Sequence, residues 1–157
     1  INHPSEMYKP TLNYYGERWI KERIIDEHPT FSDKYYNTLV PAVDRNNNDL
    51  SHSTVLPPTA SVPLATYTSW NMRAPQTGGE NSLARLSGGY IPYARDNDSA
   101  LVNRDHRDSI AGLYDTFEDY LQQYETATDS LIQDGYLLPG FKSAYMDIAR
   151  AMESMFD

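Results

Sequence analysis

The chain has 157 residues, 39% of them hydrophobic, and a formal net charge of −9. That length fits one ordinary domain, and the acidic excess argues against nucleic acid or an anionic membrane surface as a partner, because both need a basic face. The chain has no cysteine, which excludes disulfides, thiolate zinc sites and a cysteine nucleophile. No apolar run approaches the ~18 residues of a membrane span.

The first predicted element is a helix from Thr11 to Ile25. Pro10 and Thr11 suit a helix start, and His28-Pro29 is expected to end it, because a residue before proline disfavours the α region. Apolar residues recur there at the spacing of one helical face: Tyr8, Leu12, Tyr15 and Trp19.

Residues 30–103 are rich in proline and predict mostly ordered coil. Two short segments indicate strands, Thr38–Val43 with an internal proline and Val62–Trp70 with many β-branched and aromatic residues. The stretch Arg45–Asp49 between them has the composition of a turn. So long an irregular stretch is unusual in a free-standing domain, and we expect it to pack on something larger.

The last third predicts two helices, 116–133 and 139–155. Thr116 followed by Asp119 resembles a capping box, and Gly135 suits the position just after a helix. A short connection makes the two helices antiparallel neighbours. Their predicted packing faces are Phe117, Tyr120, Leu121, Tyr124, Ala127 and Leu131 on the first, and Phe141, Tyr145, Ile148, Met152 and Phe156 on the second.

No complete catalytic motif occurs in the chain. There is no G-x-S-x-G nucleophile elbow and no glycine-rich phosphate loop. The four histidines, His3, His28, His52 and His106, lack the helical spacing of a zinc pair. No cofactor is therefore predicted.

Asp44, Asn46 and Asn48 resemble the oxygen-rich beginning of a calcium loop. An EF-hand also needs glycine at its sixth position and glutamate at its twelfth, where this chain has Asp49 and Val55. The alternative, a hairpin turn held by side-chain bonds to the backbone, is the favoured interpretation. No metal is therefore expected here.

Tyr67, Trp70 and Arg73 are the candidate substrate-binding residues. Aromatic rings with one arginine could line a pocket, and the segment that carries them is bounded by proline and rich in strand-forming residues. The alternative is a buried strand that anchors the chain to a larger body.

The segment Val62–Arg73, V-P-L-A-T-Y-T-S-W-N-M-R, resembles a characteristic stretch of a bacterial family of alpha/beta-hydrolase domain proteins. Three further features resemble the same family in the same order. Leu39–Asp44 precedes the stretch, Ser87–Tyr93 follows it, and a tyrosine-bearing helix then leads to a Leu-Leu-Pro step at 137–139.

The resemblance implies an α/β-hydrolase fold for the full protein, of which residues 1–157 would be one C-terminal segment without autonomy. Most of that segment would be helices and irregular stretches, with a few short strands. The chemistry implied is hydrolysis of a small carboxylic ester by a serine upstream of Ile1, because nucleophile, acid and histidine follow in that order. His3 is the one catalytic candidate within the chain. The remainder of the hydrolase would be the partner, and a secreted or periplasmic location is favoured.

A second hypothesis belongs to another class. The chain would be a non-catalytic binding or structural module that uses its tyrosine-rich surfaces. Thirteen tyrosines stand against four phenylalanines, and tyrosine suits contact surfaces because its apolar ring ends in a polar group. An upstream G-x-S-x-G on a strand-to-helix turn discriminates between the two hypotheses.

Overall fold

The computed structural model describes residues 11–25, 28, 30–35, 39, 41–50, 55–79, 82–84 and 88–157. The chain divides into two compact units, and each is described by itself. Unit 1 comprises Ile1–Pro41 and Trp70–Ser87, and unit 2 comprises Ala42–Ser69 and Gly88–Asp157. In the part of the chain that is described, no helix is both long and apolar enough to cross a membrane.

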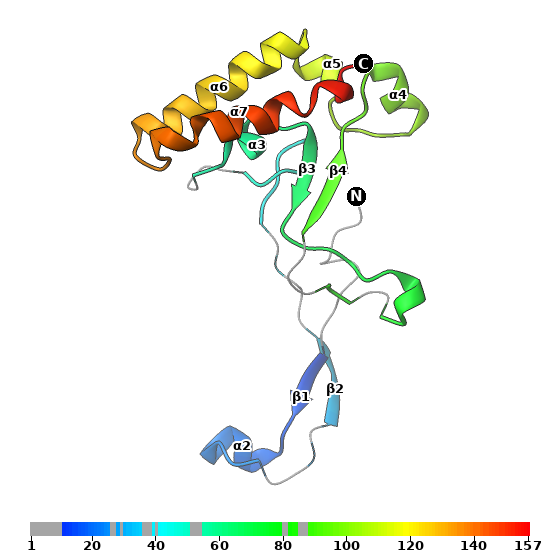
Figure 1. The fold of residues 1–157 in the computed structure, drawn as a ribbon. Helices are drawn as coiled ribbons and strands as arrows, with labels where there is room; N and C mark the ends of the chain where they lie inside the picture. Colours follow the sequence, from blue (N-terminus) through cyan, green and yellow to red (C-terminus); the bar gives the residue numbers. More distant parts are fainter. Residues whose placement is uncertain are drawn as a thin grey trace. The chain divides into compact units, whose positions relative to one another are not determined.

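Unit 1 contains a two-stranded antiparallel sheet. Strand β1 (Thr11–Tyr14) pairs with β2 (Thr30–Tyr35), and helix α2 (Glu17–Glu22) lies between them in the sequence (Figure 1). A short 3₁₀ helix, η1 (Pro75–Thr77), belongs to the same unit.

The helix predicted from Thr11 to Ile25 is therefore wrong over residues 11–16 and too long at its end. Residues 11–14 pair with residues 30–35, a tertiary effect that overrides local periodicity. Gly16 has φ 93°, a conformation that favours glycine and separates strand from helix. Arg23 adopts the left-handed conformation with φ 63°, so the helix ends before the His28-Pro29 stop.

Two antiparallel strands form the sheet of unit 2. Strand β3 (Ala65–Thr68) pairs with β4 (Gly89–Pro92), with Thr66 opposite Ile91 and Tyr67 opposite Tyr90. The predicted strand 62–70 is thus confirmed over its central four residues. Gly88 is required at the approach to β4, because a Cβ atom there would collide with the carbonyl oxygen of Thr68.

The prediction of mostly coil between residues 30 and 103 missed several elements. Beside β4, the region contains α3 (Pro58–Ser61) and α4 (Asn97–Val102), and α5 (Ile110–Leu113) follows it. These helices have four to six residues, too short to show a helical period in the sequence. Their starts are nevertheless local: Pro58 begins α3, and Asp96 and Ser109 cap α4 and α5 with side-chain oxygens.

Helix α6 (Phe117–Gln133) begins and ends as the sequence predicts. The Thr116 hydroxyl accepts a hydrogen bond from the Asp119 amide. At the other end Gly135 has φ 80°, its amide bonds the Ile132 carbonyl at 3.1 Å, and the Tyr136 amide bonds the Leu131 carbonyl at 2.9 Å. This is the Schellman arrangement that ends a helix at glycine.

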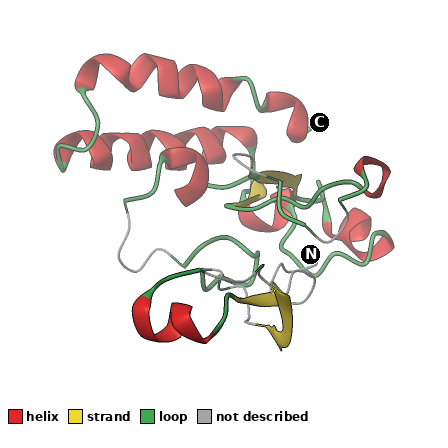
Figure 2. Cartoon of the chain, turned by 90° about the horizontal axis from the view of Figure 1, so that it is seen from below, coloured by secondary structure: helices red, strands yellow, loops and turns green. Residues whose placement is uncertain are grey.

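Helix α7 (Lys142–Arg150) runs back along α6, and Figures 1 and 2 both show the two helices side by side. The predicted antiparallel pair is confirmed. The helix predicted from 139 to 155 is shorter, because 3₁₀ turns η2 (Pro139–Phe141) and η3 (Glu153–Met155) take its ends. Its buried face is Met146 and Ala149. Of the predicted face, Tyr145, Met152 and Phe156 pack half-buried against the core, whereas Phe141 and Ile148 are exposed.

Tyrosine rings dominate the core of unit 2. Tyr93, Tyr114, Tyr120 and Tyr124 are all buried, together with Val62, Leu64, Ile110, Met146 and Ala149. Half-buried Phe156 closes the cluster, with its ring 5.4 Å from that of Tyr120 and 5.3 Å from that of Phe117. Four of the thirteen tyrosines thus serve an aromatic core rather than a surface.

Candidate functional site

The turn at Asp44–Asn48 is built by side chains bonded to backbone. The carboxylate oxygen Oδ1 of Asp44 accepts the amides of Asn46 at 2.8 Å and Asn48 at 2.9 Å. Asn46 then pairs with Asp108, donating its Nδ2 to Oδ2 at 3.1 Å and accepting the Asp108 amide at 2.9 Å. The predicted turn is confirmed, and its oxygen-bearing side chains bond other parts of unit 2.

The carboxamide of Asn48 lies along the outer edge of β3. Its Nδ2 donates to the carbonyl of Ala65 at 3.1 Å, and its Oδ1 accepts the amide of Tyr67 at 2.8 Å. One side chain therefore makes the pair of bonds that a neighbouring strand would make. Nδ2 also donates to the Tyr93 hydroxyl at 2.6 Å, which joins the turn to the core.

Arg107 holds strand β4, the other strand of this two-stranded sheet. Its guanidinium donates to the carbonyls of Ile91 at 2.8 Å and Pro92 at 2.9 Å, and to the Thr66 hydroxyl at 2.9 Å. Asp105 accepts the remaining donors, with the shortest contact at 2.6 Å. The guanidinium also lies 5.2 Å from the Tyr93 ring centroid, a cation–π contact.

The protonation states of Tyr93 and Asp105 are fixed at neutral pH. Burial, reinforced by the Asp44 carboxylate, raises the pKa of Tyr93 to about 12. Hydrogen bonds from Arg107 hold the pKa of Asp105 below its usual value. Tyr93 therefore stays a neutral hydroxyl and Asp105 a carboxylate, so neither exchanges protons near pH 7.

Tyr67 presents a half-buried ring on the β3–β4 sheet. It stands opposite Tyr90, with ring centroids 5.5 Å apart and planes tilted by 59°. Burial first, and Tyr90 second, raise the pKa of the Tyr67 hydroxyl. A cavity of ≈70 Å³ adjoins this ring, lined by Asn48, Asp49, Leu56, Ala60 and Tyr67.

The three predicted substrate-binding residues fall in different units. Tyr67 belongs to unit 2, whereas Trp70 and Arg73 belong to unit 1. Trp70 is half-buried, and Arg73 is exposed with its amide bonded to the Ser82 carbonyl at 3.0 Å. Their common role stays a prediction. The catalytic candidate His3 lies outside the described residues.

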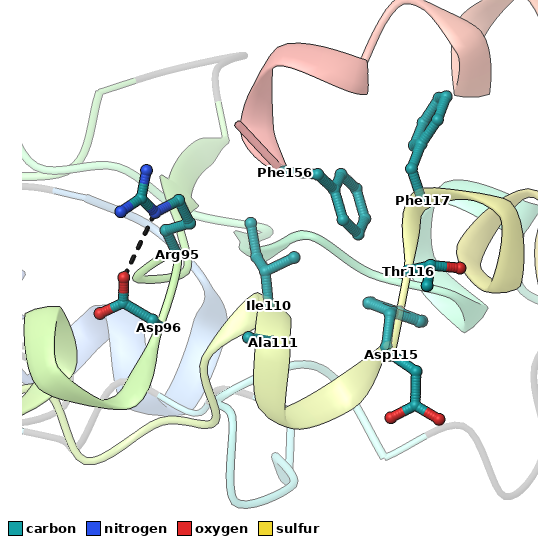
Figure 3. A pocket seen from close by; sticks show the side chains of 9 residues that line it. Arg95, Asp96, Ile110, Ala111, Asp115, Thr116, Phe117 and Phe156 are labelled. Carbon is teal, nitrogen blue, oxygen red and sulfur yellow. Dashed lines mark hydrogen bonds and ion pairs between the residues drawn. The ribbon is translucent and has the colours of Figure 1, made fainter.

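A second cavity of unit 2, with a volume of ≈220 Å³, was not predicted (Figure 3). Ile110 and Ala111 of α5, Phe117 of α6 and Phe156 near the last residue form its apolar wall. Arg95 stands at one side, bonded to Asp96 and to the main-chain oxygen of Asp157. The residues come from four separate segments, so no sequence motif indicates this site.

Arg107 and its partner Asp105 were not predicted from the sequence. A carboxylate two residues before an amide that it accepts, here at 3.0 Å, forms a local turn that the Asp105-His106-Arg107 tripeptide could have indicated. The long-range bonds to β4 leave no such local signal.

Over the described ranges, no three histidine, aspartate or glutamate side chains cluster as a metal site would need. The arrangement supplies a two-stranded sheet with an aromatic face, in which Asn48 bonds β3 and Arg107 bonds β4. Such a scaffold can form a binding surface beside chemistry performed by other groups.

Comparison with known proteins gives one match. Residues 17–147 match the model of a family described as Alpha/beta hydrolase domain. Searches of curated proteins and of solved structures return no match. The family match includes the Asp44–Asn48 turn, the β3–β4 sheet, α6 and most of α7. The chain therefore belongs to the alpha/beta-hydrolase domain family.

Proposed function

We propose that this chain is the C-terminal packing and pocket-wall portion of a carboxylic-ester hydrolase whose nucleophilic serine lies upstream. The observation that carries the proposal is the family match over residues 17–147 in a sequence that has no G-x-S-x-G elbow. An α/β-hydrolase needs an activated serine on such an elbow, so another part of the protein must supply it.

The Tyr67–Tyr90 face is the wall proposed for the substrate pocket. Tyr67 is held at its backbone by Asn48, and the paired strand β4 is held by Arg107 at Ile91, so the ring sits on a preorganised element. A wall fixed in this way limits the entropy lost when a substrate binds. The small cavity beside the ring would take a short acyl group.

The test compares two polypeptides of the same protein, this chain and a longer one that includes the upstream sequence. Both are assayed with an aryl acetate and labelled with a fluorophosphonate, which reacts with activated serines. The proposal expects turnover and labelling in the longer polypeptide alone. Fluorophosphonate-sensitive turnover by the 157-residue chain would contradict it, and so would a longer chain without an elbow or activity, which would favour a non-catalytic module.

The wall is tested separately by Tyr67→Ala in the longer polypeptide, with Tyr136→Ala as the matched control because Tyr136 is exposed on the loop after α6. We expect Tyr67→Ala to raise KM with a smaller change in kcat, since it removes binding surface rather than a reacting group. Equal kinetics for the two variants would remove Tyr67 from the pocket.

A further inference from the structure

We propose that the cavity beside Arg95 binds a small monocarboxylate with an apolar, single-ring body. The site involves no group of the proposed ester hydrolysis and stands independently of it. It lies wholly within unit 2, and it combines an apolar wall with one guanidinium at its edge (Figure 3).

The apolar part of the ligand would lie against aromatic and aliphatic side chains. Ile110 is buried at the base of the cavity, while Phe117 and Phe156 are half-buried with rings 5.3 Å apart. The volume of ≈220 Å³ is below that of pockets for drug-sized ligands, about 300 Å³ and above, so a single ring is the size that fits.

The charge of the ligand follows from which groups have unused bonding capacity. Arg95 uses Nε for Asp96, at 3.2 Å, and Nη1 for the main chain of Asp157. Among the described residues its Nη2 has no partner, and the side chain is 60% exposed at the mouth of the cavity. A guanidinium edge with free N–H groups suits a carboxylate.

The two carboxylates at the cavity do not offer an equivalent site for a cation. Asp96 caps α4, with Oδ1 accepting the Ser99 amide at 2.8 Å and Oδ2 accepting Arg95. Asp115 directs its carboxylate away from Phe156 and Ile110 (Figure 3). Arg95 is therefore the group at the mouth of the cavity whose N–H edge stays open to an anion.

The experiment titrates the full chain with phenylacetate and follows the NMR signals of the Ile110 and Ala111 methyl groups. Phenylethanol and phenylethylammonium serve as neutral and cationic analogues of the same shape. We expect saturable shifts with phenylacetate, and affinities at least about tenfold weaker for both analogues, a difference near 1.4 kcal/mol.

Variants separate the role of Arg95 from general effects. Arg95→Gln should weaken phenylacetate binding by about tenfold, Arg95→Lys should retain part of it, and Arg104→Gln, an exposed site on the loop after α4, should leave it unchanged. Unchanged methyl spectra of the free variants verify their folds. The proposal is overturned by absent or non-saturable shifts, by equal binding of an analogue, or by full affinity in Arg95→Gln.

Discussion

The backbone amide of Tyr67 is bonded by the side chain of Asn48 rather than by another strand, with a nitrogen–oxygen distance of 2.8 Å. The same carboxamide donates to Ala65 and Tyr93. Asn48 alone therefore completes the β3 edge of the sheet that bears the proposed substrate wall. This relationship makes the site sensitive to a residue that touches no substrate.

Asn48→Ala should lower the free energy of unfolding by about 3 kcal/mol, because it leaves the part-buried Tyr67 amide and the buried Ala65 carbonyl without this partner and removes one bond of the Tyr93 hydroxyl. Asn103→Ala, the same change at an exposed position after α4, should cost less than about 0.5 kcal/mol. Urea unfolding followed by far-UV circular dichroism measures both. Equal costs would mean that the Asn48 bonds add nothing to stability.

Arg107→Lys should destabilise the chain by about 2–3 kcal/mol although it preserves the charge. A lysine ammonium cannot reach both β4 carbonyls, Thr66 and Asp105 together, since it lacks the planar fork. Arg104→Lys on the same loop is the control, with an expected change near zero. A similar unfolding midpoint for both variants would show that charge alone suffices at Arg107.

The Asp105–Arg107 pair predicts a contribution to acid sensitivity. The pKa of Asp105 is lower in the folded state than in the unfolded chain, so its stabilisation is complete above the unfolded value, about 3.9, and is lost as pH falls through the folded value. Asp105→Asn should therefore flatten this part of the stability profile below pH ~4. Asn103→Ala, at an exposed position after α4 that carries no titratable group, should leave the slope as it is, and parallel profiles for the two variants would contradict the assignment.

Tyr124 and Tyr114 form a matched pair of core tyrosines. The Tyr124 hydroxyl is fully buried without a hydrogen-bond partner in the described structure, whereas the Tyr114 hydroxyl donates to the Pro63 carbonyl at 3.0 Å. Tyr124→Phe should be neutral or stabilise by up to about 1 kcal/mol, and Tyr114→Phe should destabilise by about 1 kcal/mol. Thermal melting measures the stability of both variants. A large loss of stability in Tyr124→Phe would reveal an unrecognised partner of that hydroxyl.

The phase of α7 gives the last prediction. Ala149 is fully buried against the aromatic core and Ile148 is 44% exposed. Ala149→Asp should cost more than about 3 kcal/mol, because it buries a charge, and Ile148→Asp less than about 1 kcal/mol. The reverse order would restore the face predicted from the sequence.

The features that the sequence predicts correctly are those whose determinants are local. The caps of α6, at Thr116 and Gly135, and the turn after Asp44 depend on side chains within a few residues of the groups they bond. The prediction fails where distant residues decide. Strand β1 exists through pairing with β2, and the clamp on β4 comes from Arg107, sixteen residues beyond Ile91. The cavity beside Arg95 is assembled from four segments and has no linear pattern.

The division of the chain into two units has a practical spectroscopic consequence. Both tryptophans, Trp19 and Trp70, belong to unit 1, while every tyrosine of the buried core belongs to unit 2. Tryptophan emission at neutral pH therefore reports on unit 1, whereas Tyr93 and Tyr124, whose pKa burial raises to about 12, belong to unit 2. The unlabelled chain thus carries separate optical reporters, tryptophan emission at neutral pH for unit 1 and late phenol ionisation in alkali for unit 2.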